Sequence, residues 1–381
     1  MAGIRSWSAA LLILSVLGTR PEAIKMAPLL RRLSSTPGVR SLVCVTAQHR
    51  QMLDHVLDVF AIHPDFDFNL MRDGQGLTYI TNSVMQRLGE ILRDLRPDRI
   101  LVQGDTTTAM AASLAAFYDK VPVGHVEAGL RTGNMHSPWP EELNRRLITI
   151  TADLHFPPTE AARQNLEREG VAPDRIVVTG NTVIDALLDA VEIINADPAL
   201  AASLDRQLPR LDPAKRLILV TAHRRESFNG GIGRVARALL RLADRKDIEI
   251  IYPVHLNPNV QRAAYAVLSG HPSIHLIPPL DYLPFVNVMQ RATLIITDSG
   301  GIQEEAPSLG KPVLVTRDTT ERPEAIAAGT AELVGTDTDR LVARASRLLD
   351  DPSAYAAMSV RHNPYGDGRA SGRIVEALLS E

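Results

Sequence analysis

The sequence has a single cysteine, no excess of charge of either sign, and no apolar run long enough to cross a bilayer. Cys44 is the one cysteine among 381 residues, which excludes a disulfide within the chain and favours a reducing, cytoplasmic compartment. The formal net charge is −3, with lysine and arginine spread along the chain. This excludes the basic stripe of a nucleic-acid binder or a membrane-surface protein. An anionic ligand must therefore bind to a few specifically positioned basic side chains, because the chain as a whole offers no positive field.

The apolar stretch nearest the N-terminus follows Arg5 and resembles a short signal peptide. It covers residues 9–17, about nine residues, whereas ~20 are needed to span a bilayer. It leads into Gly18-Thr-Arg-Pro-Glu22 without an Ala-x-Ala cleavage site. A buried first strand explains this stretch better than export does.

Signatures of metal sites and of common nucleotide sites are also missing. No His-Glu-x-x-His, cysteine cluster, EF-hand loop, Walker loop, Gly-x-Gly-x-x-Gly or serine nucleophile elbow occurs. Asp65-Phe-Asp67 and Asp337-Thr-Asp339 match the Asp-x-Asp pattern of some metal-dependent glycosyltransferases. Such a short match is expected by chance, and neither copy directly follows a strongly apolar strand. We therefore expect no metal and no other cofactor.

Short apolar runs alternate with amphipathic stretches along the whole chain, and 45% of the residues are hydrophobic. Continuous apolar runs are typical of parallel strands covered on both faces, so the alternation predicts doubly wound α/β sheets. The alternation of strands and helices is interrupted at residues 197–213, a polar stretch with several prolines, and resumes after it. This interruption predicts two α/β domains. The predicted strands are 12–17, 41–46, 99–103, 121–126, 154–156 and 176–179, then 217–221, 248–253, 274–276, 294–297 and 312–315. The predicted helices include 23–33, 51–60, 77–95, 107–118, 183–196, 232–242 and 282–291.

Ligands of open α/β sheets bind beyond the carboxyl ends of the strands, so the residues that follow strands are the first candidates. The first such segment is Gly18-Thr-Arg-Pro-Glu-Ala-Ile-Lys25. Pro21 suits the first turn of a helix. The helix N-terminus would then hold Arg20 and Lys25 near an anion. A capped helix with solvated cations would give the same pattern.

Carboxylates follow two further predicted strands of the first domain. Asp105 comes after strand 99–103, and Glu127 comes after strand 121–126. Glu141 begins a predicted helix, with Arg145 one turn later on the same face. Three carboxylates at one sheet edge are costly unless they are paired or titrate, so the pattern predicts proton transfer. A structural pair between Glu141 and Arg145 would give the same spacing.

The second domain offers groups suited to a diphosphate and a ribose. Ser299, Gly300 and Gly301 lie between a predicted strand and a predicted helix. Their hydroxyl and backbone N–H groups would face an anion at the helix start. Glu305, about one turn later, could accept hydrogen bonds from a ribose diol. A glycine turn with an N-cap is the alternative interpretation.

Basic residues follow two other strands of the second domain. His223, Arg224 and Arg225 come directly after strand 217–221, and such a group at a strand end favours an anion. His255 comes after strand 248–253 in a similar position. A lone histidine is more often structural, so His255 is the weaker candidate of the two.

Taken together, these segments resemble the non-hydrolysing UDP-N-acetylglucosamine 2-epimerases. The resemblance runs from Val16 to Asn363-Pro-Tyr-Gly-Asp-Gly-Arg369, which is nearly the whole chain. The matching motifs occur in order, and they are Gly-Thr-Arg-Pro-Glu-Ala-Ile-Lys-Met-Ala-Pro, Thr-Ala-Gln-His-Arg-Gln-Met-Leu, Gln-Gly-Asp-Thr-Thr-Thr, His-Val-Glu-Ala-Gly-Leu-Arg-Thr, Pro-Trp-Pro-Glu-Glu, His-Arg-Arg-Glu-Ser-Phe, Thr-Asp-Ser-Gly-Gly and Asp-Thr-Thr-Glu-Arg-Pro-Glu.

The resemblance implies a fold of the glycosyltransferase-B type, with two Rossmann-like domains and the active site in the cleft between them. The expected boundaries are 1–180, 181–362 and a tail of 363–381, whose helix at about 371–379 crosses back onto the first domain. It also implies a homodimer without metal or nicotinamide. The implied reaction interconverts UDP-N-acetylglucosamine and UDP-N-acetylmannosamine at C2 and supplies surface polysaccharides.

The resemblance also assigns roles to individual residues of this chain. The positions that match catalysis and substrate placement are Arg20, Lys25, Asp105, Glu127, Glu141 and His223. The positions that match UDP binding are Ser299, Gly300, Glu305 and Arg322, to which the sequence itself adds Arg145, Arg224, His255 and Gly301 as candidate substrate contacts. Gln48 and Gln51 match the allosteric UDP-N-acetylglucosamine site of the family. Some members carry an arginine where this chain has Gly74, so activation by substrate is in question.

The chemistry fits these residue types independently of the resemblance. A sugar C2–H is too weakly acidic to be removed by a carboxylate in water. Breaking the C1–O bond to UDP builds positive charge on the ring and acidifies that proton. Elimination to a glycal and readdition then need cations on the diphosphate, carboxylates on the sugar and a closed site.

Three other functions remain open on the sequence alone. A metal-independent glycosyltransferase of the same fold would share the UDP site but would not need three carboxylates in the first domain. A hydrolysing epimerase would admit water and release free N-acetylmannosamine. A non-catalytic nucleotide-sugar sensor would not need to retain Asp105, Glu127, Glu141 and His223 together.

Overall fold

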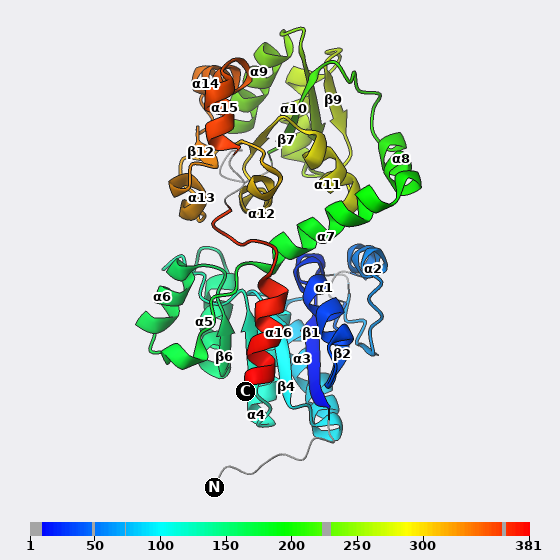
Figure 1. Ribbon diagram of the computed structural model, residues 1–381, viewed down its shortest axis with the longest axis vertical. Coiled ribbons are helices and arrows are strands. Elements are labelled where there is room, and N and C mark those ends of the chain that lie inside the picture. Colours follow the sequence, from blue (N-terminus) through cyan, green and yellow to red (C-terminus); the bar gives the residue numbers. More distant parts are fainter. Residues whose placement is uncertain (1–9, 48–49, 73, 223–229, 360–362) are drawn as a thin grey trace. The chain divides into compact units, whose positions relative to one another are not determined.

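The computed structural model describes residues 10–47, 50–72, 74–222, 230–359 and 363–381 (Figure 1). The chain divides into two compact units. Unit 1 comprises Met1–Ala186 with Gly368–Glu381, and unit 2 comprises Leu187–Asp367. Each unit contains one six-stranded sheet with helices beside it, and all the strand pairs are parallel. The predicted pair of doubly wound α/β domains is confirmed.

The sheet of unit 1 has the strand order β3-β2-β1-β4-β5-β6. The chain therefore moves to the other side of β1 after β3, and the carboxyl ends of β1 and β4 meet at this switch point, where such sheets bind ligands. The strands are β1 (Leu11–Leu17), β2 (Val39–Val45), β3 (Phe66–Asp67), β4 (Arg99–Gln103), β5 (Val123–Val126) and β6 (Leu154–Phe156).

The helices of unit 1 cover this sheet and bury its apolar runs. Helix α4 is rich in alanine and packs beside α3, and both contribute to a core with Val16, Cys44 and Ile100. The helices are α1 (Arg20–Ser35), α2 (Arg50–Val59), α3 (Leu77–Leu95), α4 (Thr107–Tyr118), α5 (Glu141–Thr151), α6 (Glu160–Arg168), the 3-10 turn η1 (Pro173–Arg175), the first part of α7 (Thr182–Ala196) and α16 (Ala370–Ser380).

Helix α16 completes unit 1 from the far end of the chain. It packs against α1, as Figure 1 shows in red and blue. The backbone N–H groups of Ala370 and Ser371 donate to the buried carboxylate of Asp185 on α7, at 3.2 and 2.8 Å. Arg373 Nη1 donates to the Thr179 carbonyl at 3.0 Å. The final helix is thus held by both its first turn and its side chains.

The sheet of unit 2 has the order β12-β11-β10-β7-β8-β9, which repeats the strand order of unit 1 with β7 in the place of β1. Its strands are β7 (Arg216–Thr221), β8 (Ile248–Pro253), β9 (Ile274–Ile277), β10 (Leu294–Thr297), β11 (Val313–Val315) and β12 (Ala331–Leu333). Its helices after α7 are α8 (Pro198–Arg206), α9 (Gly231–Ala243), α10 (Pro258–Leu268), α11 (Tyr282–Arg291), α12 (Gly300–Glu305), the 3-10 turn η3 (Ala306–Leu309), α13 (Pro323–Ala327), α14 (Thr338–Asp350) and α15 (Pro352–Met358).

The structure corrects one predicted strand. Residues 176–179 do not form a strand, and only Ile176 makes an isolated bridge to His155. The segment donates from Val177 N to the His155 carbonyl and from Thr179 N to the Pro157 carbonyl. Because Pro157 has no N–H to return, the ladder cannot continue there.

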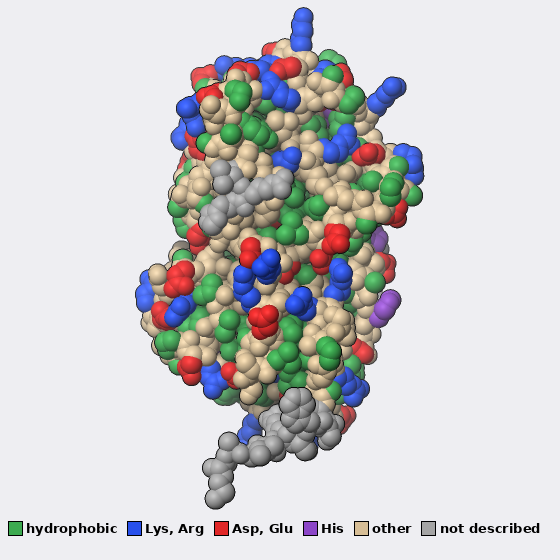
Figure 2. All heavy atoms as spheres, viewed as in Figure 1, with side chains coloured by type: hydrophobic (Ala, Val, Ile, Leu, Met, Phe, Trp, Pro, Cys, Tyr) green, Lys and Arg blue, Asp and Glu red, His purple; other side chains and the backbone are tan. Residues whose placement is uncertain are grey.

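Two features of the molecular surface bear on partners. Within the described part of the chain, no helix is both long enough and apolar enough to cross a membrane. Figure 2 shows acidic and basic side chains interspersed over the visible face of each unit, without a stripe of one sign.

Candidate functional site

Lys25 and Glu127 meet at the carboxyl edge of the unit 1 sheet, although 102 residues separate them. Lys25, on the second turn of α1, donates from Nζ to Glu127 Oε1 at 2.7 Å and to Oε2 at 2.5 Å. Gln103, the last residue of β4, also donates to Glu127 Oε2. The Glu127 side chain is 6% exposed and that of Lys25 20%. Three neighbouring post-strand segments thus converge on one nearly buried carboxylate.

Glu127 has an unusual backbone conformation for its residue type. Its φ of +63° lies in the left-handed region, which costs a non-glycine residue about 1–3 kcal/mol and is enriched at functional sites. The N–H groups of Glu127 and Ala128 both point at the Phe156 carbonyl, at 3.0 and 3.2 Å. At Gly129 a Cβ would lie 2.3 Å from the Ala162 carbonyl oxygen, so this turn is packed tightly against α6. The surrounding structure therefore holds Glu127 in this strained position.

Asp105 is fixed by a neighbouring helix. Arg145 on α5 donates from Nε to Asp105 Oδ2 at 2.9 Å, and its Nη2 lies 2.6 Å from the same oxygen. Asn144 Nδ2 donates to the Asp105 carbonyl at 2.8 Å. The Asp105 side chain keeps 28% exposure. It is therefore oriented but still reachable by a ligand.

Glu141 starts α5, as its position after Pro138-Trp-Pro predicts, but it does not pair with Arg145. Its Oε2 is buried and accepts no hydrogen bond from any described residue. An unsatisfied buried carboxylate oxygen is costly. Such an atom is suited to a substrate hydroxyl or to a proton, so the structural interpretation of Glu141 loses its main support.

Glu142, which sequence reasoning missed, is the structural carboxylate of this helix. It is fully buried and accepts from the backbone N–H groups of Thr132 and Gly133 at 3.0 and 3.2 Å, with Arg145 Nη1 at 3.3 Å. Burial opposes its charge, but these hydrogen bonds and the guanidinium together hold its pKa below the ordinary value. Glu142 thus ties the loop after Arg131 to α5.

His125 is a second residue that sequence reasoning missed, and it positions part of the site. It is fully buried on β5, and burial lowers its pKa to about 3. Its Nε2 lies 2.8 Å from the Gly104 carbonyl, which can only accept, so Nε2 carries the proton of a neutral ring. The imidazole therefore anchors the turn that carries Asp105.

Unit 2 forms the predicted turn at the carboxyl end of β10. Helix α12 begins at Gly300, and the side chain of Ser299 does not cap it. Ser299 N donates to Thr297 Oγ1 at 2.9 Å, and Gln303 Nε2 donates to the Ser299 carbonyl at 3.1 Å. The first N–H groups of a helix have no acceptor within the helix. The side chain of Ser299 therefore leaves the first N–H groups of α12 to other acceptors.

The remaining predicted UDP-binding side chains lie on two segments of unit 2. Glu305 is the last residue of α12 and is 9% exposed. Arg322 donates from Nε to Glu304 Oε1 and from Nη1 to the Glu321 carbonyl. Asn363 Nδ2 donates to the Glu304 carbonyl and, at 2.7 Å, to Ser308 Oγ. Glu304, which the sequence did not single out, therefore anchors Arg322.

Some predicted residues lie outside the described part of the chain. They are His223, Arg224 and Gln48, and the side chain of Gln51, which belongs to α2, is also outside it. Arg20 occupies the first position of α1. His255 is exposed after β8 and accepts from Asn257 N at 3.0 Å. Gly74 has a φ of +67°, and the allosteric role of Gln48 and Gln51 stays a prediction.

The Asp-x-Asp pairs have structural partners. Asp65 Oδ2 accepts from Val43 N, and Asp67 Oδ1 accepts from Asn69 N. Asp337 caps α14 by accepting from Arg340 N. Among the described residues, no group of three or more histidine, cysteine, aspartate or glutamate side chains could hold a metal ion.

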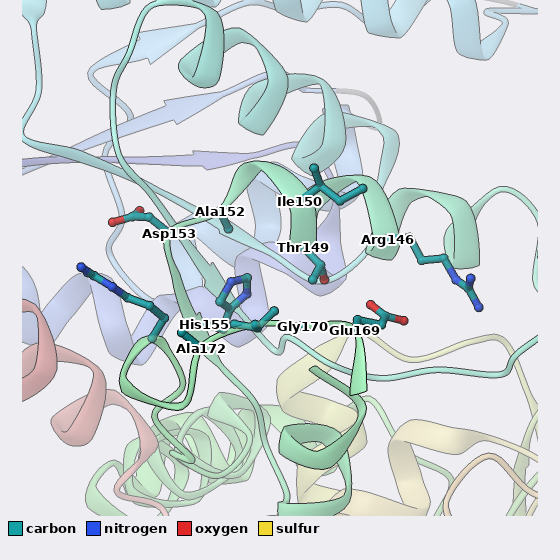
Figure 3. A pocket seen from close by; sticks show the side chains of 11 residues that line it. Arg146, Thr149, Ile150, Ala152, Asp153, His155, Glu169, Gly170 and Ala172 are labelled. Atoms are coloured by element: carbon teal, nitrogen blue, oxygen red, sulfur yellow. The ribbon is translucent and has the colours of Figure 1, made fainter. Parts of the chain in front are cut away.

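A cavity of about 710 Å³ lies along α5 and β6, and no predicted site residue lines it. Figure 3 shows Thr149 and Ile150 of α5 near His155 of β6. Its charged side chains have partners, Asp153 with Arg99, Glu169 with Arg131, Arg175 with Glu381, and Arg146 with Glu142. None of the residues that line the cavity belongs to the cluster around Glu127.

Comparisons with known proteins agree over nearly the full length. The family model described as UDP-N-acetylglucosamine 2-epimerase matches residues 31–379. The UDP-N-acetylglucosamine 2-epimerase of Escherichia coli strain K12 is 58% identical over 367 residues, which cover 96% of this chain and 98% of that protein.

Solved structures give the same result. The UDP-GlcNAc 2-epimerase from Neisseria meningitidis, bound to UDP-GlcNAc, is 50% identical with a TM-score of 0.89 and covers 97% of this chain and 100% of that one. The UDP-GlcNAc 2-epimerase from Methanocaldococcus jannaschii, in complex with UDP-GlcNAc and UDP, is 31% identical with a TM-score of 0.78 and the same coverage.

Proposed function

The chain belongs to the UDP-N-acetylglucosamine 2-epimerase family, and we propose that it interconverts UDP-N-acetylglucosamine and UDP-N-acetylmannosamine by inverting C2. Its two Rossmann-like domains are those of the glycosyltransferase-B type. The observation that carries the proposal is the pair of carboxylates on neighbouring turns of unit 1, where strained Glu127 meets Lys25 and Asp105 meets Arg145. A glycosyltransferase or a sensor has no need for this cluster, and the relatives do not favour either.

The reaction proceeds by elimination and readdition. The C1–O bond breaks with its electron pair going to UDP, and a carboxylate takes the C2 proton, which leaves a glycal. UDP then adds back to C1 while a proton reaches C2 from the other face. Two of the three carboxylates Asp105, Glu127 and Glu141 serve the two faces, since each must lie within hydrogen-bond reach of the proton that it transfers.

Cations stabilise the UDP that leaves. Arg20 and Lys25 belong to the first turns of α1, where the helix dipole also favours negative charge. We propose that His223 and Arg224 assist them. Arg145 holds Asp105 in position for the sugar.

We propose that unit 2 binds the UDP moiety. The turn at Ser299, Gly300 and Gly301 offers backbone donors to the diphosphate, and Glu305 accepts from the ribose hydroxyls. Arg322, anchored by Glu304, and His255 are the further contacts in this assignment.

We also propose a homodimer in the cytoplasm. Leu143, Leu147 and Ile150 form an exposed apolar stripe on α5 at helical spacing, and Ile150 is 77% exposed. Helix α4, which packs beside α5, ends in the exposed Phe117 and Tyr118. An apolar patch of this kind is typical of an interface between copies, and the buried free thiol of Cys44 suits a reducing compartment.

The test is incubation with UDP-N-acetylglucosamine in deuterium oxide with EDTA, followed by proton NMR. The proposal expects UDP-N-acetylmannosamine to form and deuterium to enter C2 of both sugars. Free N-acetylmannosamine with UDP would indicate hydrolysis instead. Binding of UDP without product or exchange would reject the epimerase activity on this sugar.

A further inference from the structure

A buried carboxylate that the proposed mechanism does not use joins two loops of the site. Glu22, on the first turn of α1, is 1% exposed. Its Oε2 accepts from Gly18 N at 3.0 Å and from Thr19 Oγ1 at 2.8 Å. Its Oε1 accepts from Thr106 Oγ1 at 2.7 Å, a residue 84 positions further along the chain. The turn after β1 is thereby connected to the turn after β4.

Part of this arrangement is ordinary helix capping. Thr19 and Glu22 have the spacing of a capping box, in which the glutamate accepts from groups at the helix start. A capping box, however, is complete within its own helix. The bond from Thr106 adds a long-range contact that capping of α1 does not require.

Both ends of the connection are held rigidly. A Cβ on Gly18 would lie 2.3 Å from Thr108 Oγ1 and 2.9 Å from Thr46 Oγ1, so the chain passes closely between those threonines. Thr106 Oγ1 also accepts from Ala109 N at 3.0 Å and thereby caps α4. A displacement of one turn is therefore transmitted to the other.

The connection can persist in either protonation state of Glu22. Burial raises the pKa of its carboxyl to about 7, although the hydrogen bonds from Thr106, Thr19 and Gly18 oppose this. The neutral form can donate its proton to a threonine hydroxyl, which has free acceptor capacity. A glutamine at this position can reach the same partners, with its Oε1 accepting from Gly18 N and Thr19 Oγ1 and its Nε2 donating to Thr106 Oγ1.

We propose that Glu22 is a positioning residue that fixes the β1–α1 turn to the β4–α4 turn and so sets the separation of Lys25 and Asp105. Lys25 lies one helical turn after Glu22, and Asp105 directly precedes Thr106. A misplacement of about 1 Å between reacting groups can cost about 100-fold in rate. The inference rests on the proposed function, since it concerns residues assigned there.

The first experiment compares Glu22→Ala with Glu22→Gln. We expect Glu22→Ala to lower kcat for C2 deuterium exchange by about 10- to 100-fold with little change in UDP affinity, and Glu22→Gln to restore most of the rate. Asp153→Asn is the control, because Asp153 ties Arg99 and Val123 at the opposite edge of the same sheet. It should leave kcat near the wild-type value.

Hydrogen exchange measured by mass spectrometry tests the connection without using activity. Glu22→Ala should increase exchange in residues 18–25 and 104–109 together, whereas Asp153→Asn should affect neither segment. If Glu22→Ala does not fold, Thr106→Val replaces it, with Thr106→Ser as its control. A serine keeps the hydroxyl that caps α4 through Ala109 N and donates to Glu22, so Thr106→Ser should keep the wild-type rate and protection while Thr106→Val lowers both.

The outcomes separate the two proposals. If the wild-type protein is inactive but Glu22→Ala still increases hydrogen exchange in both segments, the proposed function is rejected and the connection is kept. Wild-type kcat in folded Glu22→Ala, or equal kcat in Thr106→Val and Thr106→Ser, would overturn the positioning role. Failure of Glu22→Gln to recover the rate would also overturn it.

Discussion

The two sheets share one strand order, yet their carboxyl edges carry different chemistry. In unit 1 the edge is a network of charges in which Lys25 meets Glu127 and Arg145 meets Asp105. In unit 2 the turn after β10 is built from Thr297, Ser299 and glycines, with backbone donors at its centre. Under the proposed function, the same topology thus positions proton-transfer groups in one unit and a neutral turn for the diphosphate in the other.

Each unit also uses one buried side chain to connect two post-strand loops. In unit 1 this is the acid Glu22, which accepts from three donors. In unit 2 it is the amide Gln303, fully buried, which accepts from Thr320 Oγ1 at 2.8 Å and donates to the Ser299 carbonyl. An amide does not titrate. Of these two connections, therefore, only the one in unit 1 makes the free energy of unfolding depend on pH.

The largest effect expected from this contrast is on catalysis by unit 1. Glu127→Gln removes a proposed proton-transfer group, and such groups contribute about 100- to 10,000-fold in rate. C2 deuterium exchange followed by NMR should fall by that range, while UDP affinity measured by calorimetry stays the same. Glu169→Gln, which changes an arginine-paired carboxylate outside the cluster, is the control. A normal exchange rate in Glu127→Gln would contradict the assignment.

The second effect is on stability and its pH dependence. Burial raises the folded-state pKa of Glu22 from 4.5 to about 7, so the folded state holds this proton over a range where the unfolded state has released it. The stabilisation is full below pH ~4.5 and is lost as pH rises through about 7, a change of about 3 kcal/mol. Denaturant unfolding of wild type and Glu22→Gln between pH 4.5 and 8 measures it. Parallel pH curves would argue against the raised pKa.

A smaller effect is expected in unit 2, and on binding rather than turnover. Glu305→Gln should weaken the proposed hydrogen bonds between a charged acceptor and the ribose, each worth about 1.5–3 kcal/mol. The Kd for UDP should rise about tenfold or more, and kcat at saturating substrate should change less than in Glu127→Gln. Normal UDP affinity with reduced kcat in this variant would contradict the assignment of UDP binding to unit 2 and proton transfer to unit 1.

The smallest effect should follow chelation of metal ions. Within the described residues no cluster of metal-ligating side chains is present, and Asp65 and Asp337 are engaged by backbone N–H groups. Dialysis against EDTA should leave the exchange rate unchanged in wild type. A loss of rate that Mg²⁺ or Mn²⁺ restores would show that the site depends on a metal.

Much of the fold could be predicted because apolar runs and turn residues are local signals. Strands 99–103, 154–156 and 294–297 have the predicted bounds. Strand β3 has only two residues, which is too short to show the alternation of apolar and polar residues typical of a strand. Residues 176–179 have the composition of a strand, but they lie beside Pro157, which has no N–H group to pair with them. Both failures arise because strand pairing also depends on the residues of the partner strand, and a local sequence pattern gives no information about that partner.

The candidate site shows the same limit. Asp105 and Glu127 could be selected because they follow predicted strands. Glu141 and Glu142 begin the same helix, and sequence alone does not show that the second is buried by the loop at Thr132. The capping-box spacing of Glu22 is visible in the sequence, but its partner Thr106 is not, because the contact depends on the order of strands in the sheet.

The return of the chain to unit 1 has a consequence for biosynthesis. Residues 370 and 371 supply the donors for Asp185, and α16 covers part of α1, yet all of Leu187–Asp367 is translated before them. At ordinary rates of translation this takes roughly 10 to 40 seconds. During that interval the nascent unit 1 exposes the surface of α1 that α16 will cover and leaves the Asp185 carboxylate without its donors. A chaperone that binds apolar helix surfaces would have its main opportunity in this interval, and the N-terminal unit would complete its fold only after the rest of the chain has been synthesised.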